Sequence, residues 1–142
     1  LGWIAGPGDV IESATIHRDY NTISVGMIDD LFASMALDVS DEILERSRSI
    51  VRRNLQILDD WVATQPSIDY VKPQSGTITM LRYSADFESR ELCERILRET
   101  GVLLTPGSAF DMEGYLRIGY ANDTDVLEGG LVRLGDFFAT PH

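Results

Sequence analysis

The stretch GYLRIGYA, residues 114–121, alternates between two sides as a β-strand does. Leu116, Ile118 and Tyr120 project to one side, which their apolar character assigns to a hydrophobic core. Arg117 projects to the other side. The pattern therefore predicts a strand with one face against a core and one face carrying a full positive charge.

Two interpretations of Arg117 follow from this spacing. An arginine that points away from a core is often an exposed residue on an open sheet face. A planar guanidinium with space beside it also forms a fork, which binds a carboxylate or a phosphate through two parallel hydrogen bonds. The neighbouring Gly119 leaves that space because it has no side chain. On spacing alone the exposed surface residue is the favoured interpretation, and the fork is the alternative.

The rest of the chain supplies further elements by periodicity and turn signals. We expect strands at 1–5, 76–83 and 102–105, and helices at 25–37, 41–63 and 89–100. A last helix begins near Asp123 or Thr124 and ends near Phe138, and Pro106 with Gly107 suits a type II turn. From Lys72 onward the order is strand, helix, strand, strand, helix, which is typical of a small α/β layer with its helices on one face of a few-stranded sheet.

The helix expected at 41–63 is the longest element. Ser40 is a suitable N-cap, and apolar side chains recur along one stripe that also contains Asn54. At about 1.5 Å per residue such a helix is more than about 30 Å long. It therefore has the length to span a small domain or to link two domains.

Composition excludes some classes of function. The net charge is −11, from 12 basic and 23 acidic residues, so we expect neither nucleic acid nor an anionic membrane surface as the main partner. No apolar run is long enough to predict a transmembrane helix. Cys93 is the only cysteine, which excludes an internal disulfide and favours a reducing, cytoplasmic compartment. Because no other Cys or His lies at metal-ligand spacing, we expect no metal site.

Several motifs together resemble one family. The segment GVLLTPGSAF, followed closely by GYLRIGYA, is similar to the C-terminal part of class I/II aminotransferases, which are fold-type I pyridoxal-phosphate (PLP) enzymes. The opening LGWIAGP resembles the strand that follows the cofactor-binding lysine in that family, and KPQSGTITMLRY resembles its Pro-x-Gly-Gly-aromatic stretch, with Ser75 in place of the first glycine. The resemblance covers essentially the whole chain in order and spacing.

This resemblance implies a fold and a domain division. The fold class is α/β (α+β), the C-terminal small domain of a fold-type I PLP enzyme, preceded by a long interdomain helix. Residues 1–39 are expected to be the tail end of the large cofactor-binding domain. Residues 40–142 are expected to be the C-terminal small domain, including the linking helix 41–63. Because the chain begins with Leu1 rather than Met, we also expect that sequence upstream is missing.

The resemblance also assigns roles to residues. Arg117 matches the arginine that binds the α-carboxylate of an amino-acid substrate. The loop HRDYNTIS matches a segment near the partner subunit's active site in a homodimer, so Arg18, Tyr20 and Asn21 are candidate contacts there; a solvated loop is the alternative. The lysine that binds PLP covalently is expected upstream of Leu1, and Lys72, the only lysine present, is not a substitute.

Three functions remain open at this point. The first is an aminotransferase that moves an amino group between an amino acid and a 2-keto acid, with this chain alone inactive because it lacks the catalytic lysine. The second is a PLP-dependent carbon–sulfur β-lyase on the same scaffold. The third is a stand-alone domain that binds a carboxylate ligand or a protein partner.

Overall fold

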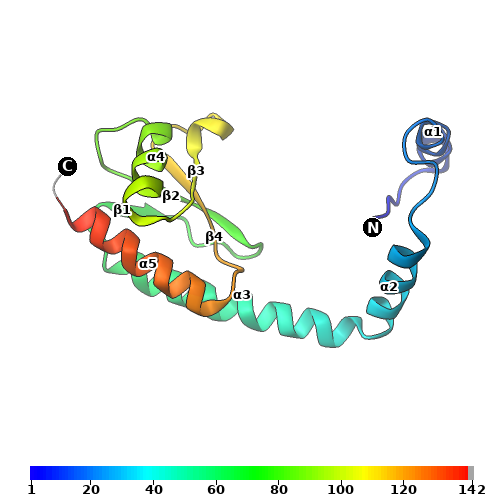
Figure 1. Cartoon of the computed structure of the whole chain (residues 1–142), viewed down its shortest axis with the longest axis horizontal. Helices are drawn as coiled ribbons and strands as arrows, with labels where there is room; N and C mark the ends of the chain where they lie inside the picture. Colours follow the sequence, from blue (N-terminus) through cyan, green and yellow to red (C-terminus); the bar gives the residue numbers. More distant parts are fainter. Residues whose placement is uncertain (141–142) are drawn as a thin grey trace. The chain divides into compact units, whose positions relative to one another are not determined.

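The computed structural model describes residues 1–140, and the chain divides into two compact units, residues 1–45 and residues from 46 onward. Figure 1 traces the chain through its helices and strands. The boundary falls inside the long helix α3 (Ser40–Ala63). Among residues 1–140, no helix is both long enough and apolar enough to cross a bilayer.

The first unit contains α1 (Gly8–Arg18) and α2 (Met27–Asp38). The prediction of a helix at 25–37 is therefore confirmed, two residues later than expected. The prediction of a strand at 1–5 is wrong: these residues are irregular and exposed. A strand is held by hydrogen bonds to a neighbour, and no other segment of the described chain pairs with this one. Neither α1 nor α2 buries a residue.

Helix α3 begins at Ser40 and ends at Ala63, as its apolar stripe predicts. Only the later part of that stripe is buried, through Asn54, Leu58 and Val62. The earlier Ile43 and Leu44 remain about half exposed. The core contact of α3 is thus made by its last three turns.

The second unit is built on a four-stranded sheet in which every pairing is antiparallel. The strands are β1 (Ile68–Tyr70), β2 (Ile78–Tyr83), β3 (Thr105–Pro106) and β4 (Tyr115–Gly119). Their order is β1-β2-β4-β3, which places β2 and β4 in the centre. Each central strand therefore has a hydrogen-bonded neighbour on both sides.

Two expectations about this sheet are wrong in detail. The 102–105 segment is not a buried strand: only Thr105 and Pro106 pair with β4, and Leu103 is 78% exposed. Pro106 and Gly107 do not form a type II turn, because a 3-10 helix, η1 (Gly107–Phe110), begins there. Strand β1 gave no sequence signal, since three residues are too few to show alternation.

Helices α4 (Ser89–Thr100) and α5 (Thr124–Ala139) have the bounds that the sequence predicts to within a residue. Gly101 ends α4 in the left-handed conformation, with φ of 73°, and its N–H donates to the Leu97 carbonyl. Core side chains from α3, α4 and α5, including Leu58, Ile96 and Leu131, pack together with the sheet.

Alternation assigns the two faces of the sheet. Leu81 and Leu116 lie opposite each other on β2 and β4, and both are fully buried. The residues on either side of Leu81 in β2 and of Leu116 in β4 point to the other face of the sheet. Their side chains are partly or fully exposed there. This confirms an α/β (α+β) fold, with a small sheet and its helices packed on one face.

Candidate carboxylate-binding site

Arg117 lies on the open face of the sheet, as the alternation in β4 predicts. Leu116 and Ile118 on either side of it are 0% and 5% exposed, whereas Arg117 is partly exposed. Met80 of β2 and Thr105 of β3 are its direct partners across the sheet. Because both neighbouring strands pair with β4 at this position, the backbone that carries the guanidinium is fixed on both sides.

The guanidinium of Arg117 has an aromatic neighbour and no acidic one. Its Cζ atom lies 5.1 Å from the centroid of the Phe110 ring, within the range of a cation–π interaction. In the part of the chain that the structure describes, Arg117 has neither an ion pair nor a side-chain hydrogen bond. Its N–H donors are therefore available to an anion.

The open face beside Arg117 leaves space for a ligand. Gly119, two residues further along β4, has no atom within 4 Å of where a Cβ would lie, so the space beside Arg117 is open. Arg82 is on the same face, next but one to Met80 along β2, and is exposed. Sequence alone gave no reason to associate Phe110 with Arg117, because the two residues come from different elements.

A carboxylate network supports the segment that carries Phe110. Glu113 Oε1 accepts hydrogen bonds from the backbone N–H of Ser89 (2.5 Å) and of Gly114 (3.2 Å), and Oε2 accepts from the Ser89 hydroxyl (3.0 Å). These bonds, with that from the Ser89 N–H first, hold the pKa of Glu113 below its usual value. The same Ser89 Oγ that donates to Glu113 accepts a hydrogen bond from the Ser108 N–H at 3.1 Å, which links the network to η1.

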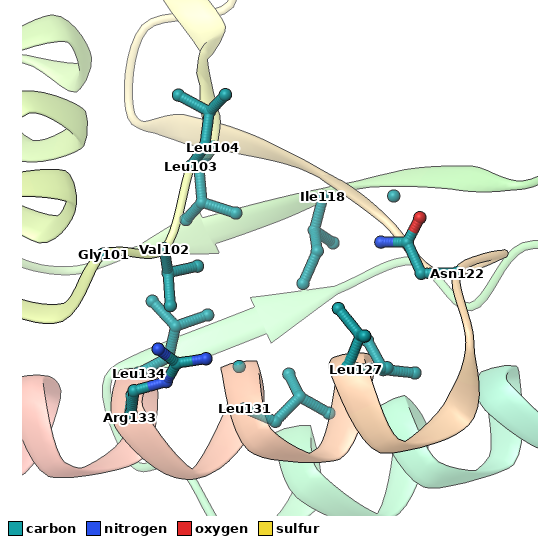
Figure 2. Close-up of a pocket in the computed structure, with 13 residues that line it drawn as sticks. Gly101, Val102, Leu103, Leu104, Ile118, Asn122, Leu127, Leu131, Arg133 and Leu134 are labelled. Atoms are coloured by element: carbon teal, nitrogen blue, oxygen red, sulfur yellow. The ribbon is translucent and has the colours of Figure 1, made fainter.

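A hollow on the other side of the sheet is a separate feature, with a volume of about 220 Å³. Figure 2 shows the side chains that line it, from the segment 101–104, Ile118 and α5. Ile118 projects into this hollow, so it lies on the helix-covered side of the sheet, whereas Arg117 points to the open side. Arg133 at its edge donates to the carbonyls of Gly129 (3.0 Å) and Thr100 (3.3 Å), which is a structural role.

The first unit contains the other three candidate residues. Arg18 and Asn21 line a hollow of about 680 Å³ together with Trp3, whereas Tyr20 is not part of its lining and is 86% exposed. The Asn21 side chain donates to the His17 carbonyl at 3.2 Å, which closes the turn after α1. Their contact with a partner subunit stays a prediction.

Lys72 is held in a structural ion pair. Its Nζ donates to Asp59 Oδ2 at 2.5 Å, and the Tyr70 hydroxyl donates to Asp59 Oδ1 at 2.6 Å. The hydrogen bond from Lys72 and then that from Tyr70 lower the pKa of the Asp59 carboxyl. Among residues 1–140, no group of three His, Cys, Asp or Glu side chains is placed to hold a metal ion.

Comparison with known proteins places this geometry in a family. The family model for aminotransferase class I and II matches residues 1–133. Capreomycidine synthase of Streptomyces vinaceus is 29% identical over 99% of this chain and 36% of its own length. Aspartate aminotransferase of Geobacillus stearothermophilus is 28% identical over 96% of this chain and 36% of its own length.

Solved structures agree with the family match. A PLP-dependent aminotransferase from Streptococcus suis superposes with a TM-score of 0.94 at 38% identity, covering 97% of this chain and 37% of that one. An aromatic aminotransferase from Pyrococcus horikoshii gives 0.86 at 26% identity, with coverage of 95% and 37%. The fold is thus that of a fold-type I PLP enzyme. The chain belongs to the class I and II aminotransferase family and spans about a third of the length of the relatives it matches.

The family implies PLP, but the residues of this chain do not by themselves fit the cofactor. The donor that binds PLP covalently is a lysine amine, and the only lysine here is paired with Asp59 in the second unit. What the described residues offer is a partly exposed guanidinium at Arg117 without an ion-pair partner.

Proposed function

We propose that this chain is the substrate-carboxylate-binding portion of a PLP-dependent aminotransferase, and that Arg117 binds the α-carboxylate. One observation carries the proposal: a guanidinium on a strand paired on both sides, directed to an open face, without an acidic partner in the described chain. A surface arginine on a strand usually contacts an acidic side chain or solvent water alone. This one also has a supporting aromatic ring and an adjacent glycine that leaves room for a ligand.

Arg117 would act by orientation rather than by chemistry. Two parallel N–H···O bonds fix both the position and the plane of a carboxylate, and each charge-assisted bond contributes about 1.5–3 kcal/mol. Holding the carboxylate fixes the Cα of an amino acid relative to the rest of the active site. PLP supplies the electron-withdrawing chemistry when it is bound, and we propose that its lysine belongs to sequence upstream of Leu1.

The proposal extends to the complete protein. Its substrates are an amino acid and a 2-keto acid, it is a cytoplasmic homodimer, and Arg18, Tyr20 and Asn21 contribute to the partner subunit's site. Residues 1–39 belong to the large cofactor-binding domain, and residues 40–142 form the small domain. This chain alone is inactive in transamination.

A second reaction type on the same cofactor has specific support. The relative that is 29% identical over nearly the whole chain is named a capreomycidine synthase, not an aminotransferase. A carboxylate clamp serves any reaction that begins with an amino acid, including a β-lyase reaction, so the role of Arg117 does not distinguish these reactions. They are distinguished by where the amino nitrogen of the substrate goes.

The test of the clamp is Arg117→Lys in the full-length protein. Lysine keeps the charge but loses the bidentate fork, so we expect KM for the amino acid to rise about 10- to 100-fold, with a smaller change in kcat. Arg82→Lys is the matched control, because Arg82 is exposed on the same sheet face and should leave KM unchanged. An unchanged KM in Arg117→Lys would show that the clamp is assigned to the wrong residue.

The reaction type is tested with a ¹⁵N-labelled amino acid. Transfer of the label to an added 2-keto acid supports transamination. Label retained in a product built from the same amino acid supports a synthase reaction, and label released as ammonia supports a lyase. A stand-alone binding domain would give none of these products while still binding a carboxylate.

A further inference from the structure

We infer that Phe110 is a positioning residue for Arg117, holding the guanidinium so that its N–H donors face outward. The inference rests on the proposed function of Arg117 and goes beyond it. A long arginine side chain on an open face samples many rotamers, and fixing it costs conformational entropy each time a ligand binds. A neighbour that fixes the side chain in advance therefore increases affinity without touching the ligand.

The contact between the two side chains has suitable geometry. With Arg117 Cζ 5.1 Å from the ring centroid, the aromatic ring attracts the cation through one of its faces. A guanidinium that stacks on an aromatic ring keeps its N–H donors in its own plane, where they can bind a carboxylate. The ring therefore occupies a surface of the arginine that a carboxylate does not use.

Burial does not explain the position of Phe110. Its side chain is 44% exposed, and it is not among the residues that form or adjoin the hydrophobic core. A phenyl ring that served only to stabilise the fold would gain more by turning inward, at about 25 cal/mol per Å² of apolar surface. The contact with Arg117 is the specific interaction that this ring makes in the described chain.

The backbone places Phe110 there independently of Arg117. Gly107 lies so close to the carbonyls of Met112 and Tyr115 that no side chain fits between them, so the glycine allows η1 to pack directly against the start of β4. After Phe110, Asp111 adopts a left-handed conformation with φ of 55°, and the Met112 N–H donates to the Gly107 carbonyl at 3.0 Å. This hydrogen bond joins the two ends of the segment 107–112, which contains Phe110.

The Glu113 network fixes the other side of the segment. Ser89 connects Glu113 to the Ser108 N–H within η1, two residues before the ring. Because the lowered pKa of Glu113 keeps its carboxylate charged at neutral pH, these hydrogen bonds persist under working conditions. Hydrogen bonds therefore connect the first turn of α4, η1 and the residues just before β4, and η1 carries Phe110.

The experiment uses the full-length protein with Phe110→Leu, Phe110→Tyr, Arg117→Gln and the double variant Phe110→Leu/Arg117→Gln. Phe110→Leu should raise KM for the amino acid and for the 2-keto acid about three- to tenfold, with kcat little changed. Phe110→Tyr keeps the ring and should restore KM. Because Phe110 acts through Arg117, Phe110→Leu should have no further effect in the Arg117→Gln background.

Leu103→Ala is the control, since Leu103 is an exposed apolar residue on the segment before η1 and should not alter KM. Thermal unfolding of each variant excludes a general loss of structure, and Phe110→Met replaces Phe110→Leu if the leucine variant fails to fold. The effect of Phe110→Leu should also be the same for amino acids with different side chains, because it is transmitted to the shared carboxylate.

The outcomes separate this inference from the proposed function. If Arg117→Gln raises KM and Phe110→Leu does not, Phe110 has no positioning role and the clamp stands. If both variants raise KM but their effects add in the double variant, Phe110 acts on its own and the inference is wrong. If Arg117→Gln leaves KM unchanged, the proposed clamp itself fails.

Discussion

Gly107 lies where no side chain fits. A Cβ at this position would overlap the Met112 carbonyl oxygen and lie 2.5 Å from the Tyr115 carbonyl oxygen. Both atoms are backbone, so neither can rotate away. We predict that Gly107→Ala lowers the free energy of unfolding by about 1–3 kcal/mol or more, because η1 must separate from the start of β4. Urea unfolding followed by circular dichroism measures this change.

The matched control is Gly119→Ala. Gly119 belongs to β4, but nothing lies within 4 Å of its Cβ position, so alanine should be tolerated within about 0.5 kcal/mol. Equal losses in the two variants would mean that close packing at Gly107 does not stabilise the fold.

The orientation of Arg117 was predictable from sequence, whereas the contact with Phe110 was not. Strand alternation depends only on the residues of one segment, so the direction of a side chain can be predicted without knowledge of the fold. The position of Phe110 depends on a 3-10 helix that replaces the expected type II turn and on a left-handed Asp111. The amino acids at these positions do not by themselves predict a 3-10 helix or a left-handed Asp111. The hydrogen bonds of Glu113 could not be predicted either, because some of its partners lie in another element.

At the scale of elements, Asn54 joins three segments. Its Nδ2 donates to the carbonyls of Tyr120 (2.9 Å) and Asn122 (2.7 Å), and its Oδ1 accepts from the Thr124 hydroxyl (2.9 Å). Asn54 itself is 0% exposed. It therefore attaches the chain between β4 and α5 to the side of α3, and its buried amide has a partner on both its nitrogen and its oxygen.

We predict that Asn54→Ala destabilises the protein by about 2–4 kcal/mol, because two carbonyls and a hydroxyl lose a buried partner at once. Urea unfolding is the measurement. Gln56→Ala is the control on the same helix: the Gln56 side chain bonds Asp60 on an exposed surface, and its loss should cost less than about 0.5 kcal/mol. A similar small loss for both would contradict the structural role of Asn54.

The helices were predictable because their apolar periodicity and end signals are local. The bounds of α4 were predicted to the residue, with Gly101 ending the helix as expected. The 102–105 segment misled the prediction because its apolar residues look like a buried strand, although Leu103 is exposed. The stripe on α3 includes the buried Asn54, but which residues this amide would bond depends on tertiary contacts.

At the scale of the molecule, stability should decline at alkaline pH through Cys93. Burial, followed by the negative charges of Glu113 and Glu94, raises the pKa of this thiol from 9.0 to about 11. The folded state thus favours the protonated thiol, and this contribution is complete below pH 9. Between pH 9 and about 11 the unfolded chain loses the proton first, so the free energy of unfolding falls by at most about 1.4 kcal/mol per pH unit.

The measurement is urea unfolding at a series of pH values from 8 to 10, in the wild type and in Cys93→Ala. The variant loses some packing at every pH, but its slope above pH 9 should be smaller than that of the wild type. Parallel slopes would mean that the thiol does not contribute. Tyrosine hydroxyls such as that of Tyr83, whose pKa is raised from 10.0 to about 12, also lower stability in the upper part of this range, but they do so in both proteins and cancel in the comparison of slopes.

The layer arrangement of the second unit was predictable from the order of its elements. From Lys72 onward, this order of strands and helices is typical of a small sheet whose helices all pack on one face. The first unit was harder to predict. The expected strand at 1–5 is absent from a unit in which residues such as Met27 and Phe32 stay exposed, at 86% and 62%. An apolar pattern within a segment indicates the structure that the segment adopts when it packs against a partner. In this unit the described chain supplies no partner strand for residues 1–5.

The central pairing of β2 with β4 has a consequence for how the protein is made. The two strands are neighbours in the sheet, but α4, β3 and η1 lie between them in the chain. Such non-local pairing is slow compared with helix formation, and until β4 arrives one edge of β2 is open to other chains. We expect a ribosome-bound chain that ends before β4 to be prone to aggregation. The strand that carries Arg117 then covers that edge of β2, so the sheet is completed in the same folding event that places the proposed carboxylate-binding residue.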